Sequence, residues 1–96
     1  SRLVAMALGN ALYAECAYDE AADIFREVTL REPCNAAAWN NLAYALAAQQ
    51  CKQAALTVLH CAISRLPGDN NLKDSLKEIS AMQNTGNNAC PAPLCQ

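Results

Sequence analysis

Apolar residues recur along this chain at intervals of three and four residues, and short breaks divide them into five segments. The first segment, residues 2–15, carries Leu3, Val4, Leu8 and Leu12 at this spacing. Such a spacing indicates a helix, whereas a half-buried strand would show strict alternation. Four further segments show the same kind of pattern over residues 20–31, 36–48, 51–66 and 70–82. The pattern therefore predicts an all-α chain of five helices.

Turn-forming and capping residues mark the ends of these helices. After the break at residues 16–18, we expect Asp19 to cap the second helix, and we expect Asn35 to cap the third. Pro33 ends the second helix because proline cannot continue one. The run Pro67–Gly68–Asp69 ends the fourth helix, and Asp69 or Asn70 is placed to cap the fifth.

The segment 35–67 has a fainter copy 34 residues upstream. Identical residues at this offset are Leu8/Leu42, Ala11/Ala45, Leu12/Leu46, Ala14/Ala48, Ala21/Ala55, Arg31/Arg65 and Pro33/Pro67. A fixed period of this size indicates a helical repeat array. We therefore expect one domain over residues 2–82, with repeats 2–35 and 36–69 and a capping helix 70–82 that has one narrow apolar stripe.

Small and large residues predict how the helices pack. Gly9, with Ala43 as its counterpart, weakens a helix and so points to close approach by a second helix. Trp39 is expected to be the most buried aromatic residue. We expect Phe25 and Leu59 to reach toward the helix pair that follows each of them.

The eight positions that define the tetratricopeptide repeat are occupied in a similar way in both copies. That family carries Trp, Leu, Gly, Tyr, Ala, Phe, Ala and Pro there. The first repeat has Ala5, Leu8, Gly9, Leu12, Ala21, Phe25, Val28 and Pro33, and the second has Trp39, Leu42, Ala43, Leu46, Ala55, Leu59, Ala62 and Pro67. The chain thus resembles two tetratricopeptide repeats and a capping helix, which implies a short right-handed α-solenoid of antiparallel helix pairs. Ala5 replaces the large residue and leaves the first pair less well filled.

The resemblance also implies a concave groove, formed by the first helix of each pair, that binds peptides. Carried over by position, its residues are Leu3, Met6, Asn10, Tyr13, Asn40, Asn41, Tyr44, Ala48, Asp74 and Glu78. Family members that grip a terminal carboxylate use Lys, Asn, Asn, Lys and Arg. Asn10 and Asn41 match the asparagines, but Met6, Asn71 and Ser75 replace the basic residues. The groove therefore favours an apolar or neutral-to-basic segment of a protein partner, although these residues could merely coat a helix.

Composition narrows the possible partners and the cellular compartment. The net charge of −2 argues against nucleic acid as a partner, which requires a clustered basic surface. No apolar run approaches the length of a membrane span. Of the six cysteines, Cys16, Cys34, Cys51 and Cys61 fall at helical or interhelical positions, so we expect reduced thiols in a cytoplasmic protein. Residues 83–96 are expected to be disordered.

Few residues suggest chemistry. His60 and Cys61 are adjacent, so they do not face each other on a helix. The acidic residues at 19–27 are typical of a helix start and a solvated face. Cys90 and Cys95 could form a small disulfide loop, belong to a docking motif for a partner, or supply half of a metal site. They could also be two thiols of a flexible tail. We expect no enzyme, cofactor or metal.

Two hypotheses for the function remain. The first is a protein-interaction module, a scaffold or chaperone-like adaptor that holds a partner segment in its groove. The second is a structural repeat segment that self-associates or stacks on further repeats of a longer chain, without a peptide ligand.

Overall fold

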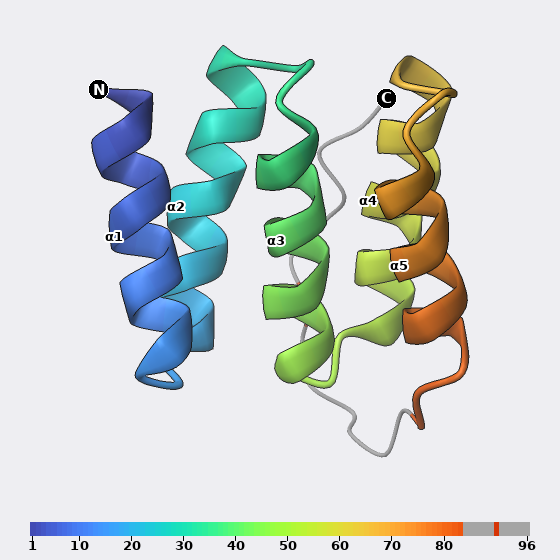
Figure 1. Ribbon diagram of the computed structural model, residues 1–96. Coiled ribbons are helices and arrows are strands. Elements are labelled where there is room, and N and C mark those ends of the chain that lie inside the picture. Colours follow the sequence, from blue (N-terminus) through green and yellow to red (C-terminus); the bar gives the residue numbers. More distant parts are fainter. Residues whose placement is uncertain (84–89, 91–96) are drawn as a thin grey trace.

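The computed structural model describes residues 1–83 and Cys90. Within this part the chain forms five helices and no strand: α1 (Arg2–Ala14), α2 (Tyr18–Arg31), α3 (Ala36–Ala48), α4 (Lys52–Arg65) and α5 (Asn70–Ser80). Each helix packs against the next, α1 also contacts α3, and α3 also contacts α5. Helices α1, α3 and α5 thus form one layer, and α2 and α4 form the other (Figure 1). The predicted all-α arrangement of successive helix pairs is confirmed.

Two of the three predicted helix caps are present. The Asn35 side chain accepts a hydrogen bond from the Ala38 amide at 3.1 Å, and Asp69 accepts one from the Leu72 amide at 3.0 Å. These bonds satisfy amides that have no partner within their own helix. The predicted cap at Asp19 is wrong, because α2 begins at Tyr18 and Asp19 lies inside its first turn.

A left-handed turn, rather than a capping side chain, sets the start of α2. Cys16 has φ of 65°, and the Ala17 amide reaches back to the Leu12 carbonyl at 2.9 Å. The second pair repeats this geometry: Gln50 has φ of 64°, and the Cys51 amide bonds to the Leu46 carbonyl at 2.9 Å. This turn satisfies the last carbonyls of the preceding helix and fixes where the next helix begins.

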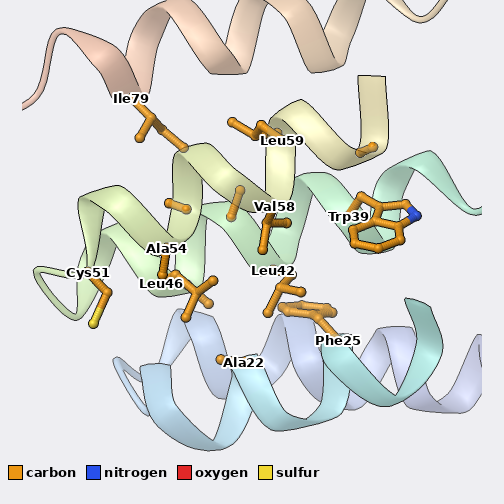
Figure 2. Close-up of a cluster of buried hydrophobic side chains, with 14 of the residues drawn as sticks. Ala22, Phe25, Trp39, Leu42, Leu46, Cys51, Ala54, Val58, Leu59 and Ile79 are labelled. Carbon is orange, nitrogen blue, oxygen red and sulfur yellow. The ribbon is translucent and has the colours of Figure 1, made fainter. Parts of the chain in front are cut away.

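The core lies between the two layers (Figure 2). Its largest fully buried side chains are Phe25, Leu42, Leu46, Val58, Leu59, Leu72 and Ile79. Phe25 is 0% exposed and Trp39 is 3% exposed, so the prediction that Trp39 is the most buried aromatic is wrong by a small margin. Trp39 lies nearer the surface because its indole N–H donates to the Pro33 carbonyl, at 2.7 Å, in the loop before α3.

Gly9 lies where two helices come into close contact, as predicted. A Cβ atom at this position would lie 2.5 Å from the ring of Phe25. On its other side the same ring faces Leu42 of α3 (Figure 2). Phe25 therefore packs between α1 and the following pair, and only a glycine leaves room for it.

The prediction of reduced thiols is wrong for three cysteines. Cys51 forms a disulfide with Cys90, with the two Cα atoms 5.7 Å apart, and Cys61 is also disulfide-bonded. The chain leaving α5 passes the start of α4, where the Lys52 ammonium donates to the Met82 carbonyl at 2.9 Å. This contact places Met82, just beyond the end of α5, beside the residue that follows Cys51. A disulfide loop between Cys90 and Cys95, one of the alternatives that the sequence left open, is therefore excluded. The predicted disordered tail otherwise falls on residues 84–89 and 91–96, outside the described part.

Cys16 and Cys34 are free and exposed. Within residues 1–83, no helix combines the length and the apolar character that crossing a membrane requires.

Candidate functional site

The layer formed by α1, α3 and α5 carries all of the predicted site residues (Figure 1). Leu3, Asn10, Asp74 and Glu78 are exposed. The half-buried members are Met6, Tyr13, Asn40, Asn41, Tyr44 and Ala48. The repeat offset explains this placement, because equivalent positions on α1 and α3 lie side by side.

Hydrogen bonds between side chains join the three helices across this face. The Asn41 amide group donates to the Asn10 side-chain oxygen at 3.0 Å, which links α3 to α1. The Ser75 hydroxyl donates to the Asn40 side-chain oxygen, which links α5 to α3. Ser75 itself is buried. Three of these four side chains are among the predicted peptide contacts, and the structure gives them a role in positioning the helices.

Between α1 and α3 the face has a hollow of about 150 Å³, lined by Tyr13, Phe25, Asn41 and Tyr44. Phe25 belongs to α2 and is fully buried, so it lies at the inner end of this hollow. The Tyr13 ring packs edge-on against Tyr18, with ring centroids 5.1 Å apart, which fixes the orientation of Tyr13. The sequence predicted Phe25 as a packing residue. That Phe25 also lines this hollow could not be predicted, because it depends on the gap between α1 and α3.

Tyr44 lies close to α5. Burial raises the pKa of its hydroxyl above the usual value, the Ser75 hydroxyl lowers it, and the Glu78 carboxylate raises it. Because even the ordinary pKa of a tyrosine hydroxyl is about 10, the phenol is protonated at neutral pH and can donate a hydrogen bond. The effect of Glu78 on Tyr44 indicates that this carboxylate lies on the α3 side of α5.

The charged groups on this face are acidic. Helix α3 contains no charged residue, and α5 contributes Asp74 and Glu78. Lys77 is rotated away from Glu78, and Lys73 from Asp74, because residues one apart on a helix point about 100° apart. A second hollow, of about 190 Å³, lies near the start of α3 and α5, and Asn40, Asn71 and Asp69 are among its lining residues. An apolar hollow with carboxylates beside it suits an apolar segment with a nearby positive charge.

Other titratable residues have ordinary structural positions. His60 is exposed on α4, and two acidic residues of α2 form ion pairs within the helix, Asp23 with Arg26 at 3.1 Å and Glu27 with Arg31 at 3.6 Å. Among residues 1–83 and Cys90, no group of three or more His, Cys, Asp or Glu side chains is placed to hold a metal ion.

Comparison with family models, curated proteins and solved structures finds no match for this chain. The tetratricopeptide resemblance therefore rests on the repeated residues alone.

Proposed function

We propose that this chain is a protein-interaction module of the tetratricopeptide type, whose α1–α3–α5 face binds a peptide or helical segment of a partner protein. Its role would be that of a scaffold or a chaperone-like adaptor. The supporting observation is the hollow between Tyr13 and Tyr44 with Phe25 at its inner end. Aromatic residues in such pockets often dominate binding energy, because they offer a large apolar area at little cost in conformational entropy.

The partner segment supplies an apolar side chain for this hollow and a lysine or arginine near Asp74 and Glu78. These carboxylates are exposed, so each ion pair contributes only about 0–1 kcal/mol and serves mainly to orient the segment. A terminal carboxylate is disfavoured, because Met6, Asn71 and Ser75 are uncharged.

Selection from a random peptide library tests this function. We expect enriched peptides to combine an apolar residue with a nearby basic one. Tyr44→Ala should weaken their binding at least about tenfold, the size expected for an aromatic anchor, while the helical circular dichroism signal stays unchanged. Glu78→Lys should reduce the preference for basic residues.

His60→Ala is the matched control, since His60 is exposed on α4, in the other layer. It should bind the selected peptides like the unsubstituted chain. Equal binding by Tyr44→Ala would refute the assignment of this face.

Self-association or stacking on other repeats is the second candidate, and the outer side of α1 favours it. Val4 and Leu8 are 66% and 48% exposed, whereas their counterparts Ala38 and Leu42 on α3 are fully buried. Sedimentation velocity across a concentration series distinguishes the two functions. Growth with concentration that Leu8→Lys abolishes would support association.

For the location, we propose an oxidising compartment instead of the cytoplasm. The expectation of a cytoplasmic protein rested on reduced thiols, whereas disulfides such as Cys51–Cys90 persist mainly in oxidising surroundings. Alkylation of the native protein before reduction should label Cys16 and Cys34. Labelling of Cys51 and Cys61 at this stage would refute the proposed compartment.

A further inference from the structure

One difference between the two helix pairs is the size of the side chain at the equivalent positions Ala5 and Trp39. Trp39 belongs to the main core and is 3% exposed. At Ala5, a hollow of about 240 Å³ opens between α1 and α2. Its apolar lining comes from Ala5, Ile24 and Val28. The last two are the repeat counterparts of Val58 and Ala62, so the first pair offers apolar surroundings like those of Trp39 without an indole ring.

The rim of this hollow is charged but balanced. Glu27 and Glu32 stand where the second pair has Cys61 and Leu66. Arg2 forms an ion pair with Glu32, and Arg31 pairs with Glu27 at 3.6 Å. Since each of these side-chain charges already has a counter-charge, a charged occupant would break an ion pair. An uncharged group fits this rim better.

The same rim favours an aromatic group over an aliphatic one. The side chains of Arg2 and Arg31 are 68% and 81% exposed, so the faces of their ion-paired guanidinium groups remain accessible to a ring that enters the hollow. The carboxylate of Glu32 can accept a hydrogen bond from a ring N–H. In the second pair the indole N–H of Trp39 likewise has an acceptor, the Pro33 carbonyl.

From these observations we infer that the hollow between α1 and α2 is a docking site for the indole ring of a tryptophan side chain of a partner protein. The site lies between α1 and α2, apart from the hollow formed by Tyr13 and Tyr44. The two sites can therefore be occupied and tested independently.

Titration with N-acetyltryptophanamide, an uncharged indole probe, tests the inference by methyl NMR on the 96-residue chain. We expect the Ile24 and Val28 methyl signals to shift while those of Ile79, in α5, stay unchanged. A single small ring should bind with a dissociation constant of about 1 mM. Ala5→Trp places an indole in the hollow from within, so it should weaken probe binding at least about tenfold and raise the melting temperature.

Ala7→Trp is the matched control, because Ala7 is exposed on α1 and does not line the hollow. It should leave probe binding unchanged. If Ala5→Trp does not fold, the smaller Ala5→Leu should give a partial loss of binding. Three results would each overturn the inference: no shift at Ile24 and Val28 with about 10 mM probe, undiminished binding by a folded Ala5 variant, or a dimer that Ala5→Trp dissociates.

Discussion

The two helix pairs share one apolar pattern yet occupy different environments. On α3, Ala38 and Leu42 are fully buried, and this helix contacts all four of the others. Their counterparts on α1, Val4 and Leu8, are 66% and 48% exposed, because among the five helices α1 contacts only α2 and α3. The pattern therefore determines which side of a helix is apolar, and the neighbouring helix determines whether that side is buried.

The difference also extends to stability. Of the seven largest fully buried side chains, only Phe25 belongs to the first pair. The disulfide-bonded Cys51 and Cys61 lie at the start of α4 and within it, and their counterparts in the first repeat are Ala17 and Glu27. Buried area and covalent ties are concentrated in α3–α5. We therefore regard α1 as the least stable helix, the one that opens first in local unfolding.

The largest expected effect is at Trp39, which distinguishes the two pairs most clearly. Trp39→Ala should lower the free energy of unfolding by about 3–5 kcal/mol, because it opens a cavity in the core and removes the bond to Pro33. Urea unfolding followed by circular dichroism measures this loss. A nearly neutral substitution would show that Trp39 is not part of the core.

Leucines at equivalent positions isolate the effect of the neighbouring helix. Leu42→Ala should cost about 2–5 kcal/mol, the usual range for a fully buried leucine. Leu8→Ala should cost less than about 1 kcal/mol, because nearly half of that side chain is exposed. The same unfolding experiment compares them. Equal losses would mean that α1 is covered on its outer side, by self-association for instance.

Removing the Cys51–Cys90 disulfide tests how much this covalent link stabilises the fold. Cys51 and Cys90 are 39 residues apart, and closing a loop of this size is expected to stabilise the fold by about 2–4 kcal/mol. The double substitution Cys51→Ser, Cys90→Ser should therefore lower the melting temperature, measured by calorimetry without reductant. Cys16→Ser, at a free and exposed thiol, should change it little. If a reducing agent left the unsubstituted chain equally stable, the stabilisation would be refuted.

Features that depend on local sequence could be predicted. Periodicity and turn residues gave α3 as residues 36–48, and Asn35 and Asp69 cap as expected. The start of α2 was missed because a left-handed Cys16 determines it, and no glycine or asparagine at that position signals such a turn.

Features that depend on contacts between distant residues could not be predicted. The repeat offset correctly predicted that Tyr13 and Tyr44 lie on the same layer. It could not predict the depth of the hollow between them. The bonds of Asn41 to Asn10 and of Asn40 to Ser75 require the spacing between helices, which a sequence pattern does not contain. The disulfide partner of Cys51 could not be predicted either, because Cys90 is 39 residues away in the sequence. Their proximity depends on where α5 ends relative to the start of α4.

The smallest expected effect concerns Gly9 and Ala43, where the two pairs combine small and large residues differently. The first pair matches Gly9 with Phe25, and the second has Ala43 with the smaller Leu59. Gly9→Ala should gain about 1 kcal/mol in helix propensity but lose about 1–3 kcal/mol, because the new Cβ would lie 2.5 Å from the buried Phe25 ring. We expect a net loss of about 1 kcal/mol.

A double-mutant cycle with Phe25→Leu tests the cause of this loss. The double variant Gly9→Ala, Phe25→Leu has alanine and leucine at these positions, as the second pair has in Ala43 and Leu59. Ala at position 9 should then be neutral or stabilising, because the smaller side chain leaves room for the Cβ atom. Ala43→Gly, the matched change in the second pair, should cost about 1 kcal/mol in propensity with no steric relief. If the loss from Gly9→Ala persisted in the Phe25→Leu variant, close contact with the ring would not be the reason for the glycine.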